Sequence, residues 1–190
     1  MNYQIYKPNS KNTGCAFNFS IDTRNNKANF YVNAIQQFGW NEKTKNGSFV
    51  GNKDNPEKKV SIKLNEYELG EIVSTIETRI PWSGYHDFND NKTSISFVPW
   101  DKVRKISTKD KGYVEHIAPA FGFSIIRNGN QIFRVSLEPG EVQVLKHMIL
   151  KFFDLRLQSS SNVTKQFDAP NNTDSSTREQ SSSEDSDFDF

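Results

Sequence analysis

The segment QIFRVSLEPGEVQVLKHMILKFF, residues Gln131–Phe153, changes its hydrophobic period in the middle. Apolar and polar residues alternate across Phe133–Leu137, which is typical of a half-buried strand. From Val142 onward the apolar residues recur at intervals of three and four, which predicts a helix with a wide apolar face. Pro139, followed two residues later by Glu141, marks the first turn of this helix. The segment therefore predicts a strand that runs directly into a helix.

An earlier segment, KVSIKLNEYELGEIVSTIET (Lys59–Thr78), has the same design. When the two segments are overlaid with an offset of 73 residues, strand falls on strand and Glu68 falls on Glu141. Asn65 and Glu68 have the spacing of a capping box, in which each side chain bonds the backbone N–H of the other residue. The sequence therefore predicts two copies of one unit, each of which ends in a helix.

Other segments with a period of two supply the remaining strands. They are Cys15–Asp22, Ala28–Phe38 and Val60–Leu64 in the first unit, and Thr93–Val98, Phe121–Arg127 and Gln131–Leu137 in the second. Trp40–Pro56 and Trp100–Lys111 are expected to be loops. Antiparallel strands closed by one helix per unit indicate an α+β fold with two repeats of a multi-stranded sheet followed by a helix. The expected division is a flexible N-terminal arm (1–13), a folded domain (14–157, with repeats 14–80 and 81–157) and a disordered tail (158–190).

Charge is distributed unevenly along the 190 residues. Residues 158–190 hold seven acidic side chains against Lys165 and Arg178, a net charge of −5, so residues 1–157 carry +6. A basic body indicates a polyanionic partner, and an acidic tail can compete with that partner.

The single cysteine, Cys15, excludes an internal disulfide framework and a thiolate metal cluster, and it fits a reducing compartment. The sequence has neither the roughly 20-residue apolar segment that spans a bilayer nor the apolar core of a signal peptide. We therefore expect a soluble, cytoplasmic protein. Its Asn-rich and Lys-rich composition is associated with phage or bacterial proteins, and a phage protein would act in the host cytoplasm.

Three segments resemble the Whirly proteins, which belong to the same superfamily as the transcriptional coactivator called positive cofactor four. The segments are KKVSIKLNEYELGEIVSTI, HDFNDNKTSISFVPW and FGFSIIRNGNQIFRVSLEPGEVQVLKHMILKFF. The resemblance covers about Thr13–Leu157. It implies two units of four strands and one helix, tetramers formed through the helices, and single-stranded nucleic acid bound along sheet edges between protomers. The Lys-Gly-Lys-Ala-Ala-Leu segment of the plant family has no counterpart, because Asn12–Phe17 reads NTGCAF.

Binding a single strand without sequence preference requires cations for the phosphates and flat faces for the bases, and each stacked base contributes roughly 1–3 kcal/mol. The outward faces of the predicted strands and the loops supply both. The candidate single-stranded DNA-binding residues are Tyr31, Asn33, Trp40, Lys43, Lys45, Lys59, Lys63, Trp82, Trp100, Lys102, Arg104, Lys105 and Arg134. The alternative is that Tyr31 and the tryptophans only stabilise the fold, and that each lysine is a solvated surface side chain. The inward phenylalanines are expected to form the core: Phe17, Phe19, Phe30, Phe97, Phe121, Phe123 and Phe133.

The last eight residues, SEDSDFDF, resemble the acidic, Phe-terminated tip with which bacterial and phage single-strand-binding proteins contact replication and repair proteins. The acids of such a tip would meet a basic rim, and Phe190 would fill an apolar pocket while its carboxylate pairs with an arginine. The candidate partner-binding residues are Glu184, Asp185, Asp187, Phe188, Asp189 and Phe190. The alternative is an acidic tail that only keeps the protein in solution. A further hypothesis is that the tail occupies the body's own basic groove and weakens DNA binding.

Catalytic motifs give no comparable signal. His86, Asp87, Glu115 and His116 are candidate acid–base or metal residues, but the sequence has no H-E-x-x-H, phosphate-cradling glycine loop or G-x-S-x-G. We expect a non-catalytic protein without a cofactor or metal. Its expected function is to bind single-stranded DNA in replication, recombination or repair. A transcription regulator or RNA-binding protein on the same fold is the alternative, and an adaptor whose sheet binds protein is a third hypothesis.

Overall fold

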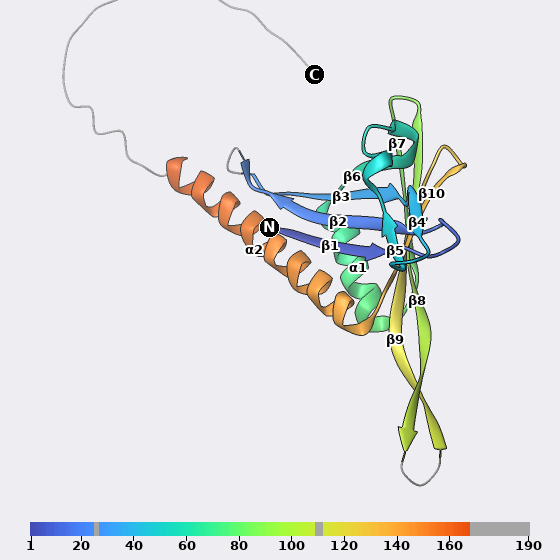
Figure 1. Ribbon diagram of the computed structural model, residues 1–190. Coiled ribbons are helices and arrows are strands. Elements are labelled where there is room, and N and C mark those ends of the chain that lie inside the picture. Colours follow the sequence, from blue (N-terminus) through green and yellow to red (C-terminus); the bar gives the residue numbers. More distant parts are fainter. Residues whose placement is uncertain (25–26, 109–111, 168–190) are drawn as a thin grey trace, which may run out of the picture.

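The computed structural model describes residues 1–24, 27–108 and 112–167, and it contains two four-stranded antiparallel sheets, each followed by a helix (Figure 1). The first unit comprises β1 (Asn2–Lys7), β2 (Cys15–Asp22), β3 (Asn29–Gln36), β6 (Lys59–Leu64) and α1 (Glu66–Thr78). The second comprises β7 (Trp82–Phe88), β8 (Asn91–Thr108), β9 (Gly112–Arg127), β10 (Gln131–Leu137) and α2 (Pro139–Phe167). Between β3 and β6 lie the small hairpin β4 (Gly39–Asn41) and β5 (Asn46–Ser48) and two short 3₁₀ turns, η2 (Val50–Asn52) and η3 (Pro56–Lys58).

Both sheets are meanders, with the strand orders β1-β2-β3-β6 and β10-β9-β8-β7. The two units therefore have the same topology, which confirms the predicted α+β fold with two strand-and-helix repeats. The strands of one sheet run across those of the other, and both helices lie on the same side of the molecule (Figure 1).

Aromatic side chains from the inner faces of both sheets fill the core. Phe17 of β2 meets Phe123 of β9 edge-to-face, with 5.8 Å between ring centroids, and Phe30 of β3 meets Phe152 of α2 at 5.9 Å. These edge-to-face contacts are the favoured geometry for aromatic rings. All seven phenylalanines predicted to be inward are buried. This confirms the predicted inner faces of the strands that carry them.

The junction between strand and helix is alike in both units, as the overlay predicted. The Glu68 carboxylate accepts from the Asn65 backbone N–H at 2.9 Å, and Asn65 Oδ1 accepts from the Glu68 N–H at 2.9 Å, so the capping box is confirmed. The Glu141 carboxylate accepts from the Glu138 backbone N–H at 2.7 Å in the same manner. Each carboxylate satisfies an N–H that the first turn of a helix leaves unpaired.

The N-terminal residues correct one expectation. Instead of a flexible arm, Asn2–Lys7 forms β1, which pairs along its whole length with β2. Ile5 is buried opposite Phe17. The first unit therefore begins with this strand rather than near residue 14.

Two further expectations are also corrected. Trp100–Lys111 is not a loop over its described part, because β8 continues to Thr108 and pairs with β9 without interruption. The second helix does not end at Leu157 but continues to Phe167, so residues 158–167 are helical rather than disordered. The rest of the predicted tail lies outside the described residues. No helix in the described ranges has the length and apolar content to cross a membrane.

Candidate nucleic-acid interface

The outer face of the first sheet carries polar and aromatic side chains in ordered rows. Strand alternation places every second residue on this face, and the register sets Tyr31 beside Lys63 and Asn33 between Asn18 and Ser61. The rows continue onto the edge strand, where Gln4 pairs with Asn18.

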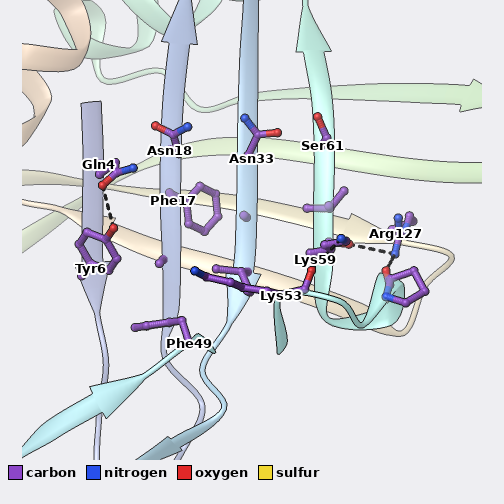
Figure 2. Close-up of a pocket in the computed structure, with 15 residues that line it drawn as sticks. Gln4, Tyr6, Phe17, Asn18, Asn33, Phe49, Lys53, Lys59, Ser61 and Arg127 are labelled. Carbon is purple, nitrogen blue, oxygen red and sulfur yellow. Dashed lines mark hydrogen bonds between the residues drawn. The ribbon is translucent and has the colours of Figure 1, made fainter. Parts of the chain in front are cut away.

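An open groove of about 690 Å³ crosses all four strands of this face (Figure 2). Its polar floor comes from Gln4, Asn18, Asn33 and Ser61, which Figure 2 shows across neighbouring strands. None of the described residues that line it is acidic. A polyanion that enters the groove therefore meets no like charge from its walls.

Three cations line the groove: Lys53, Lys59 and Arg127. Lys59 Nζ donates to the Lys53 carbonyl at 2.7 Å, which keeps both lysines on the same rim. The Arg127 guanidinium reaches from the second sheet to the carbonyls of Lys59, at 3.1 Å, and Pro56. Figure 2 shows Lys59 and Arg127 at one end of the groove, and the Lys53 side chain extends from there toward Tyr6.

The segment that carries Lys53 is tied to the sheet by one buried amide. Asn52 is 8% exposed, and its Nδ2 donates to the Gln36 carbonyl at 2.9 Å. The Phe38 backbone N–H, just beyond β3, also donates to the Ser48 carbonyl at 2.7 Å. These bonds place Phe49 and Lys53 over the outer face of β3.

Two aromatic rings lie at the other end of the groove. Tyr6 of β1 is 57% exposed and meets Phe49 edge-to-face, with 5.9 Å between ring centroids. The Tyr6 hydroxyl donates to Gln4 Oε1 at 2.7 Å, which orients the ring (Figure 2). Exposed rings beside cations can stack on bases while the cations bind phosphates.

Four of the predicted residues lie on this outer face: Tyr31, Asn33, Lys59 and Lys63. Asn33 and Lys59 line the groove, and Tyr31 and Lys63 form the next row. The carboxylate nearest these rows along β2 is Asp22, whose pKa is held below its usual value because the Arg24 side chain donates to it at 2.6 Å.

Three other predicted residues lie in the small hairpin rather than in the groove. Trp40 is half-buried in β4, and its indole N–H is buried without a hydrogen-bond partner among the described residues. Lys43 and Lys45 are exposed in the turn, where Lys45 Nζ pairs with Glu42 at 2.7 Å.

Trp82 is a wrong prediction. It is 8% exposed on the inner face of β7, where it pairs with Phe97 and belongs to the core. A Cβ at Gly84 would lie 2.7 Å from the Trp82 ring, so the ring rests directly on that glycine. A buried indole cannot stack on a base.

The remaining predicted residues lie on β8 and β10. Trp100 is 40% exposed, and Lys105 is exposed farther along the strand. Lys102 and Arg104 both pair with Glu138, at 2.9 Å for Arg104, and these cations hold the pKa of the Glu138 carboxyl below its usual value. The positive charges of Lys102 and Arg104 are therefore partly neutralised.

Arg134 lies elsewhere, in a separate groove of about 490 Å³ between β10 and the start of β2. The structure therefore does not gather the predicted residues into one site. The tail residues Glu184–Phe190 lie outside the described residues.

The candidate list lacked Asn18 and Ser61 of the groove floor, which lie on outward positions of predicted strands. It also lacked five other lining residues: Gln4, Tyr6, Phe49, Lys53 and Arg127. The alternation of Tyr3 and Ile5 with Gln4 and Tyr6 was the available signal for the first two. The other three reach the groove only through tertiary structure, so no local pattern marks them.

His86, a candidate catalytic residue, has a structural contact. Its Nε2 lies 2.6 Å from Glu68 Oε1, the carboxylate that caps α1. Among the described residues no cluster of three or more His, Cys, Asp or Glu side chains could hold a metal ion.

Comparison with known proteins supports the fold. No family model and no curated protein matches the chain. The structure of the plant transcriptional regulator PBF-2 is 13% identical, has a TM-score of 0.50 and aligns over 87% of this chain and 87% of its own. The structure of WHY1 from Arabidopsis thaliana is 12% identical, with a TM-score of 0.47 and coverage of 92% and 97%. Both are Whirly proteins, and the likeness to PBF-2 shows a Whirly-like fold.

Proposed function

We propose that this protein binds single-stranded DNA with little sequence preference through the groove on the outer face of its first sheet. The observation that carries the proposal is a groove whose described lining residues include three cations and no acid, together with the exposed ring of Tyr6 and the half-buried ring of Phe49. Cations that contact the phosphates of the nucleic acid supply affinity without recognising its sequence. Rings add stacking that any base can provide.

The shape of the groove favours a single strand over a duplex. It is an open trough on a sheet, and its floor is made of side-chain amides and a hydroxyl. Unpaired bases can reach such a floor with their Watson–Crick edges and can stack on Tyr6, whereas in a duplex those edges are paired and the base faces are stacked on one another.

We extend the proposal to a cellular role. The protein would coat exposed strands in replication, recombination or repair, in the cytoplasm of a bacterium or of a phage-infected host. The Phe-terminated tip would recruit replication and repair proteins, and copies would assemble through their helices, with a tetramer favoured. The proposed role is non-catalytic and requires no cofactor.

The alternative is a transcription regulator or an RNA-binding protein that uses the same groove. The name of PBF-2 as a plant transcriptional regulator is the observation that favours it. Side-chain amides and lysines can bind RNA as well as DNA. A contact to the 2′-hydroxyl of the ribose, which distinguishes RNA from DNA, forms only in the complex.

Fluorescence anisotropy tests the proposal, with labelled oligo-dT, oligo-U and duplex DNA at several salt concentrations. The groove variant is Lys53→Gln/Lys59→Gln, and the matched control is Lys11→Gln/Lys151→Gln, which removes the same charge outside the groove lining. The groove variant should weaken binding to oligo-dT and reduce the salt slope by about 1.4, because each lost phosphate contact contributes about 0.7 for a single strand.

Tight oligo-dT binding that only the groove variant weakens would support the proposal. A preference for oligo-U would favour the alternative. Equal binding of duplex and oligo-dT, or equal loss in both variants, would contradict the groove as a single-strand site.

A further inference from the structure

The outer parts of β8 and β9 form a two-stranded ribbon that projects from the body (Figure 1). This ribbon, called the arm, comprises residues 100–108 and 112–120. The pairing of β7 with β8 ends at Phe97 and that of β10 with β9 ends at Phe121, so the described arm residues pair only with one another. A two-stranded ribbon alone is marginally stable in water. The body contacts the base of the arm, where Glu138 pairs with Lys102 and Arg104 and Ala120 is buried, so a partner surface is needed for the outer part of the ribbon.

Apolar side chains on the arm are unusually open to solvent. Val103, 53% exposed, lies opposite Ile117, 62% exposed. Ile106 lies opposite Val114, and both are about half exposed. Tyr113, nearer the tip, is 71% exposed. An exposed apolar surface on a long edge strand indicates a protein interface, because a protein that leaves such a surface uncovered tends to aggregate.

One face of the arm has a complementary pattern on its two strands. Residues two apart lie on the same face, so this face, called the odd face, carries four cross-strand pairs of described residues. They are Asp101 with Pro119 at the base, where Asp101 also pairs with Arg79 of the body, and then Val103 with Ile117, Lys105 with Glu115, and Ser107 with Tyr113. Lys105 Nζ lies 4.0 Å from Glu115 Oε1, and both side chains are about two-thirds exposed. The cation lies on β8 and the anion on β9.

We propose that the odd face of the arm binds the odd face of a second copy of this chain, around a two-fold axis parallel to the strands. This axis places β8 of each copy over β9 of the other. Lys105 then meets the partner's Glu115, and Val103 meets the partner's Ile117. The ion pair and the apolar contact each occur twice, as a two-fold contact requires. An axis perpendicular to the strands would place Lys105 on the partner's Lys105.

The same pattern argues against nucleic acid as the occupant. The described part of the odd face has one cation, Lys105, and two anions, Glu115 and Asp101, the second of which pairs with Arg79 of the body, so this face offers a polyanion no net attraction. Its apolar centre is Val103 and Ile117, and aliphatic side chains have no flat ring on which a base can stack. A second copy satisfies both the apolar pair and the charges.

Charge reversal tests the proposal with full-length protein in the absence of nucleic acid. Lys105→Glu makes the odd face acidic, and Glu115→Lys makes it basic. Each variant alone should sediment as a lighter assembly than the native protein, because identical arms then repel. An equimolar mixture of the two should recover the native sedimentation coefficient, since an acidic arm is complementary to a basic one. The double variant Lys105→Glu/Glu115→Lys should assemble as the native protein does.

The mixture separates contact between copies from damage within the arm, because mixing cannot repair a misfolded ribbon. Val103→Thr/Ile117→Thr should also reduce assembly, whereas Val50→Thr, an equally exposed apolar position outside the arm, should not. Native sedimentation of both charge variants would overturn the proposal. So would a mixture that sediments no faster than its components.

Discussion

At the scale of single residues, one buried amide holds the wall of the groove. Asn52 donates to the Gln36 carbonyl and is almost fully buried, so truncation leaves that carbonyl without its donor. An unsatisfied buried acceptor costs about 1–3 kcal/mol. We therefore predict that Asn52→Ala lowers the free energy of unfolding by that amount, measured by urea denaturation. Affinity for oligo-dT should also fall, because Lys53 lies on the released segment.

The control for this prediction is Asn46→Ala, which removes the same side chain at an exposed position of β5. Its stability should stay within about 0.5 kcal/mol of the native protein, as is usual for surface substitutions. If Asn52→Ala unfolds at the same urea concentration as Asn46→Ala, the amide does not hold the wall.

The positions of individual residues were predictable where a strand alternates clearly. The alternation around Tyr31 placed this residue on the outer face beside Lys63, as observed. Trp82 was not predictable in this way. The inward positions of β7 after it are Gly84 and His86, so the strand has no apolar alternation that would mark its inner face.

At the scale of elements, the strand–helix junctions were predictable and the arm was not. The junctions depend on local signals, namely a change of period and a capping carboxylate. The arm follows Pro99, which usually ends a strand because it lacks an N–H. Here β8 continues beyond Pro99. Its pairing with β7 has already ended at Phe97, so the missing N–H interrupts no hydrogen bonds to β7. Tertiary context therefore decides this element.

The N-terminal strand and the end of α2 were missed for a related reason. Asn2–Lys7 has one aliphatic residue, Ile5, among three polar or charged residues and two tyrosines, so its apolar alternation is weak and pairing with β2 fixes it as a strand. Residues 158–167 are rich in serine and other weak helix formers, yet they continue a helix that is already nucleated. Adding residues to an existing helix is easier than starting one.

Glu138 anchors the base of the arm, and this gives a prediction for its pH dependence. The side chains of Lys102 and Arg104 lower the pKa of the Glu138 carboxyl from its usual 4.5. A lowered pKa means that the ionised form stabilises the fold. The contribution is complete above pH 4.5 and is lost as the pH falls through the lower, folded-state pKa.

Hydrogen exchange of the backbone amides, corrected for intrinsic rates, measures this effect. Amides at the base of the arm should lose protection in the native protein as the pH falls below 4.5. Glu138→Gln should show reduced protection at neutral pH and no further loss in the acid range. The control Glu42→Gln, which breaks the exposed pair with Lys45, should leave the arm unchanged. Equal protection in all three proteins would show that Glu138 does not anchor the arm.

At the scale of the whole molecule, charge divides the chain into a basic body and an acidic tail. The last 23 residues hold seven acidic side chains against Arg178, a net charge of −6, so residues 1–167 carry +7. The groove that the body presents has cations and no acid among its described lining residues. The tail and a nucleic-acid backbone therefore offer the same kind of charge to the same surface.

Truncation of the tail tests this competition. The stop belongs after Phe167, because α2 continues to that residue and an earlier stop would shorten the helix. We predict that the shortened chain binds oligo-dT more tightly than the full chain at low salt. The difference should shrink as salt rises, because screening at about 1 M reduces the range of charge interactions to about 3 Å. Anisotropy titrations of both chains across salt concentrations measure it.

A full-length chain with its seven tail acids replaced by Asn or Gln is the control, since it keeps the length and removes the charge. It should bind as tightly as the truncated chain if charge alone is responsible. If it binds as the native chain does while the truncated chain binds more tightly, bulk or the terminal phenylalanines obstruct the groove instead. Identical affinities for all three chains at low salt would mean that the tail does not compete for the groove, and its acidic tip would then be left for partner proteins alone.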